Sequence, residues 1–79
     1  MSTPELARQA SQLRADLHGF DRRIQELSEE FGRIDRHSHG DSAEAALLEI
    51  LDLLADARLD LRSVDRHLET TVRHAESLR

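Results

Sequence analysis

The residues of this chain whose types and spacing could do chemistry are its histidines. His37 and His39 are separated by a single residue, and Asp41 follows at the same spacing. Imidazole nitrogens and a carboxylate so close together are ligands that zinc or nickel accepts. His37, His39 and Asp41 are therefore the candidate metal ligands, although the short polar segment that carries them would hold an ion weakly. We expect no resident cofactor.

Two further histidines, His67 and His74, lie one heptad apart in the second half of the chain. Seven helical residues rise about 10 Å, so these two rings are too far apart to share one ion directly. The Glu-x-x-His pair of di-iron helical bundles does not occur in the sequence. A metal-binding helical bundle is thus an alternative function, and it would depend on His37, His39 and Asp41.

Motifs for catalysis are absent from the sequence. It contains no Gly-rich phosphate loop, no nucleophile elbow and no paired catalytic carboxylates. We therefore expect a protein that is not an enzyme. Arg14, Arg62 and Arg66 could grip a phosphate, because guanidinium groups bind phosphate oxygens in pairs. A small-molecule or nucleotide sensor, with its ligand between two copies of the protein, is a second alternative.

Heptad patterns in both halves of the 79-residue chain indicate the elements that carry these side chains. Apolar residues alternate at spacings of four and three, which is the seam of a coiled coil. In the first half they are Leu6, Ala10, Leu13, Leu17, Phe20, Ile24, Leu27, Phe31 and Ile34. In the second half they are Ala43, Leu47, Ile50, Leu54, Ala57, Leu61, Val64, Leu68, Thr71, Ala75 and Leu78. The sequence predicts an all-α, two-helix antiparallel coiled-coil hairpin.

Capping residues divide the hairpin into its parts. Thr3 is a suitable cap for the first helix, with Pro4 at its first position. Gly40 is suited to end that helix, and Asp41 with Glu44 forms a capping box for the next one. We predict a single domain over residues 1–79, with a first helix at about 4–37, a turn at 38–42 and a second helix at about 43–78.

The register of the hairpin follows from matching the two seams. Each apolar residue then finds an apolar partner, as in Leu17 with Val64 and Phe20 with Leu61. The flanking positions bring together complementary charges, namely Arg14 with Asp65, Asp21 with Arg58, Arg23 with Asp60, and Asp16 with His67. Exposed ion pairs add little stability, so these pairs are expected to specify the antiparallel alignment.

Residues 47–54 are apolar on nearly all sides of the second helix. A single neighbouring helix cannot cover such a segment, which implies a second contact surface. A second hairpin, from an identical or a related chain, would complete a four-helix bundle. The partner-binding residues expected from this segment are Leu47, Leu48, Leu51, Leu53 and Leu54.

Composition limits the classes of partner. The formal net charge is −5, and each arginine cluster has acidic neighbours, so we do not expect nucleic-acid binding. No apolar run is long enough to span a bilayer, and the first residues do not resemble a signal peptide. We expect a cytoplasmic protein that does not bind membranes, and secretion without a cleaved signal peptide remains an alternative.

The turn region resembles that of a known family. Gly40, followed by Ser42-Ala43-Glu44-Ala45 at the start of the second helix, is similar to the small Trp-Xaa-Gly helical-hairpin proteins of type VII secretion. Ser38 stands where those proteins have tryptophan, and the sequence has no tyrosine for their export signal. The short hairpin chaperones of type III secretion are similar in size and pattern. Both resemblances imply a hairpin that forms a homodimer or heterodimer and acts by binding partners.

These observations together predict a non-enzymatic interaction module. We expect the hairpin to associate with itself or with another helical protein, and to act as an adaptor, a small chaperone or a regulator. The sequence does not identify the partner.

Overall fold

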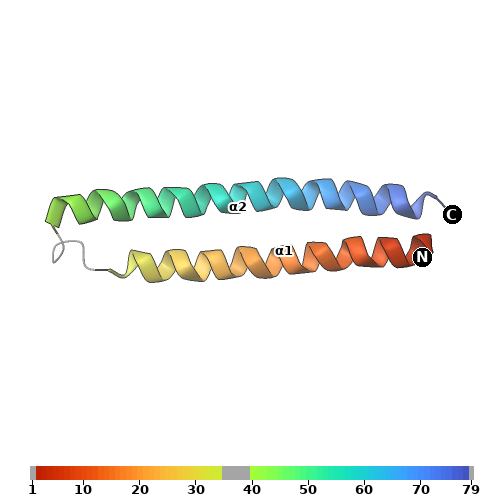
Figure 1. Ribbon diagram of the computed structural model, residues 1–79, viewed down its shortest axis with the longest axis horizontal. Helices are drawn as coiled ribbons and strands as arrows, with labels where there is room; N and C mark the ends of the chain where they lie inside the picture. Colours follow the sequence, from red (N-terminus) through yellow and green to blue (C-terminus); the bar gives the residue numbers. More distant parts are fainter. Residues whose placement is uncertain (1, 35–39, 79) are drawn as a thin grey trace.

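The computed structural model describes residues 2–34 and 40–78, with the side chains of residues 40 and 41 left out. It contains two helices, α1 (Thr3–Gly32) and α2 (Gly40–Glu76), and the described residues include no strand. The helices run side by side in opposite directions, so that both chain ends lie at the same end of the molecule (Figure 1). The prediction of an all-α, two-helix hairpin is confirmed.

The first helix starts and ends earlier than expected. Ser2, and not Thr3, is the cap, and its Oγ accepts a hydrogen bond from the backbone N–H of Glu5 at 3.4 Å. At the other end, the backbone N–H of Arg33 donates to the carbonyl of Glu30 at 3.2 Å, which closes the last turn. The helix therefore ends at Gly32, five residues before the predicted end, at one of the residue types least favourable to a helix. Residues 35–39 lie outside the described part of the chain.

The second helix begins at Gly40, three residues before the predicted start. Gly40 thus opens α2 and does not close α1, and Asp41 lies within the helix and not at its cap. The helix ends at Glu76, two residues before the predicted end, with Arg73 and His74 in its last turn. Basic side chains there interact favourably with the negative end of the helix dipole.

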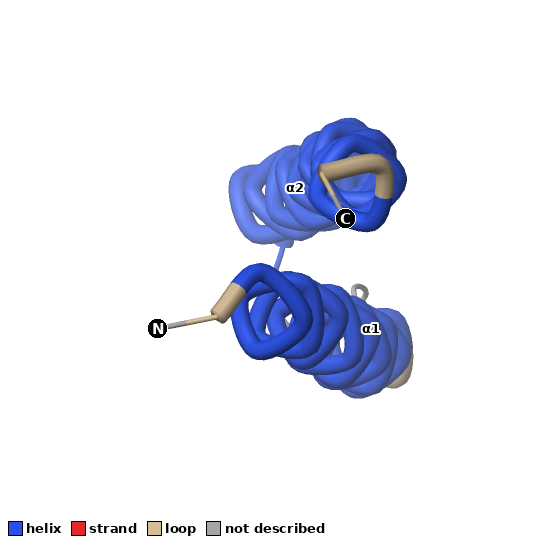
Figure 2. The backbone as a smooth tube through the Cα atoms, turned by 90° about the vertical axis from the view of Figure 1, so that its right-hand side faces the viewer, coloured by secondary structure: helices blue, strands red, loops and turns tan. Residues whose placement is uncertain are grey.

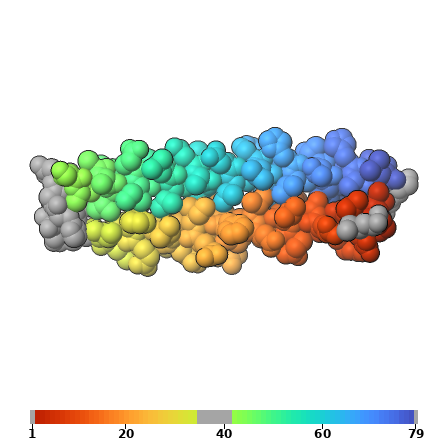
Figure 3. Space-filling model, in the orientation of Figure 1, coloured from red at the N-terminus to blue at the C-terminus, as the bar shows by residue number. Residues whose placement is uncertain are grey.

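The two helices form one layer, as the end-on view shows, and the described residues form no third element that covers them (Figure 2). The molecule is a rod of 60 × 15 × 14 Å, and its space-filling surface is continuous along both helices (Figure 3). Among the described residues Leu47 is the one hydrophobic side chain that is buried, at 7% exposure. A single contact between two helices therefore leaves most apolar side chains partly open to water. Neither described helix is both long and apolar enough to cross a membrane.

Helix α1 is turned about its axis relative to the predicted seam, whereas α2 keeps most of its predicted seam at the interface. The less exposed side chains of α1 include Ala7, Ala10, Arg14, Leu17, Asp21, Ile24, Ser28 and Phe31. Those of α2 include Ala43, Leu47, Ile50, Leu51, Leu54, Ala57, Arg58, Leu61, Asp65, Leu68, Val72 and Ala75. Four of the nine residues in the predicted seam of the first helix are therefore at the interface, namely Ala10, Leu17, Ile24 and Phe31. The other five are exposed, and polar residues such as Arg14 and Asp21 lie at the interface in their place.

Candidate functional site

Two ion pairs occupy one side of the interface between the helices. The Nε of Arg14 donates to Oδ1 of Asp65 at 2.9 Å, and its Nη2 donates to Oδ2 at 3.2 Å. Arg58 binds Asp21 in the same two-pronged way, at 2.9 and 3.3 Å. These are two of the four predicted pairs. The side that carries them is called here the ion-pair side of the hairpin.

The carboxylates of these pairs are held in their charged form. The hydrogen bond from Arg58 lowers the pKa of Asp21, and the hydrogen bond from Arg14 lowers the pKa of Asp65, in each case against a smaller opposing effect of desolvation. The same hydrogen bonds raise the pKa values of both arginines. Hydrogen bonds to a charged group favour that form, so both pairs stay ionised at neutral pH.

The other two predicted pairs do not form within the hairpin. No ion pair joins Arg23 to Asp60 or Asp16 to His67, although the structure describes all four residues. All four side chains are exposed, whereas those of Arg14, Asp21, Arg58 and Asp65 are half-buried. The orientation of α1 that turns the ion-pair side toward α2 turns its opposite side toward water. The side chains of the two unformed pairs lie on that opposite side, too far apart to form ion pairs.

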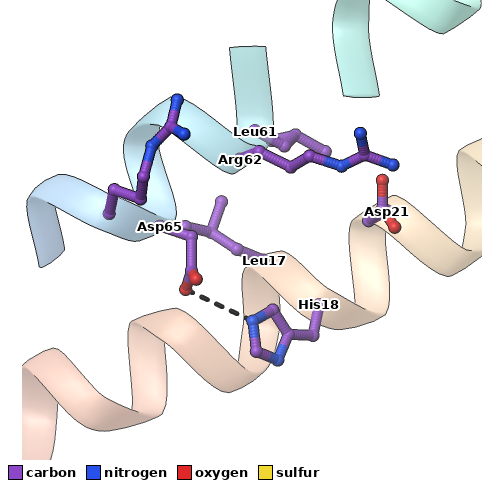
Figure 4. Close-up of a pocket in the computed structure, with 7 residues that line it drawn as sticks. Leu17, His18, Asp21, Leu61, Arg62 and Asp65 are labelled. Atoms are coloured by element: carbon purple, nitrogen blue, oxygen red, sulfur yellow. Dashed lines mark ion pairs between the residues drawn. The ribbon is translucent and has the colours of Figure 1, made fainter. Parts of the chain in front are cut away.

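A shallow notch of about 290 Å³ lies on the ion-pair side (Figure 4). His18 reaches across it, with its Nε2 3.3 Å from Oδ1 of Asp65, and Arg62 extends toward Asp21. Its lining consists of Leu17, His18, Asp21, Leu61, Arg62, Asp65 and Arg66. Two aspartates balance the two arginines, so the notch offers an anion no excess of positive charge. Arg14, the third arginine of the sensor hypothesis, is paired with Asp65 and is not part of this lining.

The predicted metal ligands lie outside what the structure describes. His37 and His39 are not described, and of Asp41 only the helical backbone is. Within residues 2–34 and 40–78, no three histidine or acidic side chains come together as metal ligands would. His67 and His74 are both exposed on α2.

The predicted partner-binding leucines do not form one outward surface. Leu47 is buried inside the hairpin, and Leu51 and Leu54 are half-buried against α1. Leu48 and Leu53 are exposed, at 46% and 57%, but five helical positions separate them by about 140° around the axis. The five leucines therefore do not share one outward surface in the hairpin, and their part in binding a partner stays a prediction.

An apolar stripe runs along α1 instead and continues to Ile34, two residues beyond the end of the helix. Its five members recur every seven residues and keep between 37% and 53% of their surface exposed. They are Leu6, Leu13, Phe20, Leu27 and Ile34. The sequence placed them correctly on one heptad column, but it assigned that column to the inside of the hairpin.

The stripe continues onto α2. Asp21 pairs with Arg58 on the ion-pair side. The preceding residues, Phe20 and Ala57, are rotated by about 100° around their helix axes and therefore lie on the opposite side of the hairpin. Near the turn, Ile34 lines a hollow together with Ala43, Ala46, Leu47 and Ile50 of α2. Leu53 lies one heptad beyond Ala46, and Val64 lies two heptads beyond Ile50, so both belong to this side. We call the stripe of α1 together with Ile50, Leu53 and Val64 the open face.

The chain matches no protein family model, no curated protein sequence and no solved structure. The resemblance to the Trp-Xaa-Gly hairpin proteins therefore stays a prediction, and the function must be argued from the surface itself.

Proposed function

We propose that this protein is a non-enzymatic helical-hairpin interaction module, which covers its open face by associating with itself or with another helical protein. The observation that carries the proposal is the column of five half-exposed apolar side chains, four of them on α1 and the fifth, Ile34, just beyond its end. Isolated apolar residues are ordinary on protein surfaces, whereas a contiguous apolar strip marks an interaction site. An adaptor, a small chaperone and a regulator would all use such a strip.

The energy available from the open face supports this proposal. Completing the burial of a half-exposed leucine or phenylalanine gains about 1 kcal/mol. Leu53 and Val64 of α2 add to the five side chains of α1, and the contact continues along nearly the full length of the rod. Helices are the natural partners of such a strip, because side chains seven residues apart fit the grooves of a facing helix.

The ion-pair side is the less suitable docking surface. Its centre is occupied by two arginine–aspartate pairs that already satisfy each other. A partner packing there would have to remove water from these charges without providing better hydrogen bonds. The proposed four-helix bundle is therefore built by stacking a second pair of helices on the open face.

The experiment is a measurement of molar mass by light scattering on a sizing column, over a wide range of protein concentration. We expect the native protein to exceed its monomer mass of 9.0 kDa, and the Leu13→Glu/Leu27→Glu variant to be monomeric. Leu59→Glu is the matched control, because Leu59 is equally exposed, at 55%, and lies away from the open face.

Equal behaviour of the open-face variant and the control would contradict the proposal. If the native protein is monomeric, the same two variants are compared for loss of binding to a helical partner. The proposal then requires that only the open-face variant loses that binding.

A further inference from the structure

We propose that the occupant of the open face is a second copy of this chain, related to the first by a twofold axis that crosses α1 near Phe20. In this dimer α1 packs antiparallel on α1 of the second copy, and the two turns lie at opposite ends of the four-helix bundle. The inference rests on the proposed function, and it specifies the partner and the geometry of the same surface.

The spacing of the apolar stripe is symmetric about Phe20. Leu13 and Leu27 lie seven residues on either side of it, and Leu6 and Ile34 lie fourteen residues on either side. A twofold axis perpendicular to the helix reverses the order of residues in the second copy. Leu13 then faces Leu27 of the second copy, and Leu6 faces Ile34. Each of the five side chains meets another apolar side chain.

The charges beside the stripe are also complementary under the same axis. Asp16 and Arg23 lie along its outer edge, four residues before and three residues after Phe20. The axis therefore places Asp16 beside Arg23 of the second copy, and it does so twice in each dimer. Opposite charges at the edge of an apolar seam select helix orientation and partner.

Both of these side chains are available for such a contact. Arg23 is exposed and forms no hydrogen bond or ion pair with any described residue. Asp16 is exposed and accepts a hydrogen bond from Nε2 of Gln12 at 3.0 Å, a neighbour one turn away on the same helix. The hairpin thus carries an exposed pair of opposite charges that its own second helix does not use.

The surface of α1 also has a hollow of the required kind. It measures about 360 Å³ and lies between Phe20, Arg23, Ile24 and Leu27. These residues are spaced as i, i+3, i+4 and i+7, which is the arrangement that receives one side chain of a facing helix. Under the twofold axis the middle of this hollow lies at the level of residues 16 and 17 of the second copy, and the stripe side chains on either side of that level are those of Leu13 and Phe20.

The second helix agrees with the same axis. Because Asp21 pairs with Arg58, the level of Phe20 corresponds to about residue 58 on α2. Leu53 and Val64, its exposed residues on the open face, lie five and six residues on either side of that level. The axis therefore brings Leu53 opposite Val64 of the second copy. The apolar contact then extends over both helices of each hairpin.

The first test reverses the edge charges and then exchanges them. Asp16→Arg places two arginines together at each contact, and Arg23→Asp places two aspartates together. Each single variant is expected to raise the dimer dissociation constant about tenfold at low salt. The double variant Asp16→Arg/Arg23→Asp exchanges the charges across the axis and is expected to return to within about threefold of the native value. Arg22→Asp, on an exposed site away from the open face, is the control and should change little.

The second test uses the absence of cysteine from the chain. Asp16→Cys and Arg23→Cys are made as separate variants, mixed, and treated with a short thiol cross-linker. The antiparallel dimer predicts a cross-linked product of twice the monomer mass. If the turns lay at the same end of the bundle, α1 would face α2 of the second copy, and Arg23→Cys would instead cross-link to Asp60→Cys.

The outcomes separate this inference from the proposed function. A dimer that Leu13→Glu/Leu27→Glu dissociates, but that the double charge exchange fails to restore, overturns the twofold axis and leaves the open face as an interaction surface. A native protein that stays monomeric at all concentrations overturns the second copy as occupant. A dimer that is insensitive to all open-face variants overturns both.

Discussion

At the scale of single residues, two aspartate–arginine pairs decide how the helices of this hairpin face each other. Their bidentate geometry holds Asp21 and Asp65 half-buried in the interface, where an apolar seam would otherwise continue. The sequence identified both pairs from charge complementarity. It did not identify His18 and Glu69 as further neighbours of the Asp65–Arg14 pair, at 3.3 and 3.6 Å, because their contacts depend on rotation about the helix axes.

These pairs give the hairpin a defined response to acid. The pKa values of Asp21 and Asp65 are lower in the folded state than in the unfolded state. The two charged carboxylates therefore stabilise the fold fully at a pH above the unfolded-state pKa of about 3.9. The effect is lost as the pH falls below that value and through the lower folded-state values. We expect Asp21→Asn/Asp65→Asn to lose less thermal stability than the native protein between about pH 5 and pH 2. Circular dichroism melting curves measure this difference.

The control for the acid response is Asp52→Asn/Asp56→Asn. It removes two exposed carboxylates that form no ion pair with any described residue. This variant should keep the native dependence on pH. An equal flattening of the curve in both variants would show that the interfacial pairs have no special part in acid stability.

Two adjacent leucines test how the core depends on burial. Leu47 is 7% exposed and Leu48 is 46% exposed, although they have the same chemistry and neighbouring positions. Leu47→Ala is expected to lower the free energy of unfolding by about 2–3 kcal/mol, because it leaves a cavity in the one buried position of the described chain. Leu48→Ala should cost less than about 1 kcal/mol. Urea unfolding of both variants measures the difference, and equal losses would place Leu48 in an interface.

At the scale of the helices, the heptads predicted the existence, order and direction of α1 and α2. The ends were less accurate, since several residues near each end could serve as caps and the sequence does not rank them. The choice of Ser2 over Thr3 and the start of α2 at Gly40 are examples. The rotation of the helices was also outside the sequence prediction. The heptad pattern of α1 is compatible with two orientations of the helix about its own axis, because apolar residues occupy two positions of each heptad and charged residues lie beside them. The ion pairs of Arg14 with Asp65 and of Arg58 with Asp21 favour one of these orientations.

Gly19 offers a test of the intrinsic stability of α1. It lies in the middle of the helix, and a Cβ added there would meet nothing within 4 Å. Glycine within a helix is less favourable than alanine by about 0.5–1 kcal/mol, so Gly19→Ala should stabilise the hairpin by that amount. Gly32→Ala is the control, because that residue has the same free space but is the last of the helix. A melting temperature lowered by Gly19→Ala would mean that a facing helix approaches this residue closely.

At the scale of the whole molecule, the sequence and the structure agree that a two-helix hairpin cannot bury its own apolar surface. The sequence located the excess at residues 47–54, where apolar side chains are densest. The structure shows exposed apolar side chains in both halves of the chain, including Leu48 and Leu53 of that segment, and it adds the column along α1, where polar residues such as Arg14 and Asp21 lie at the interface instead. The number of apolar residues in the sequence indicates how much apolar surface a partner must cover. The orientation of each helix about its axis determines where on the hairpin that surface lies.

This excess would couple folding to the proposed association. If a second copy covers the open face only in the folded state, mass action raises the apparent stability with protein concentration. We expect the melting temperature of the native protein to rise measurably over a hundredfold increase in concentration. That of Leu13→Glu/Leu27→Glu should stay constant and lower, since its open face no longer binds. Leu59→Glu should follow the native protein, because Leu59 lies outside the open face. A native melting temperature independent of concentration would mean that the hairpin is stable alone, and that a different protein covers the stripe from Leu6 to Ile34.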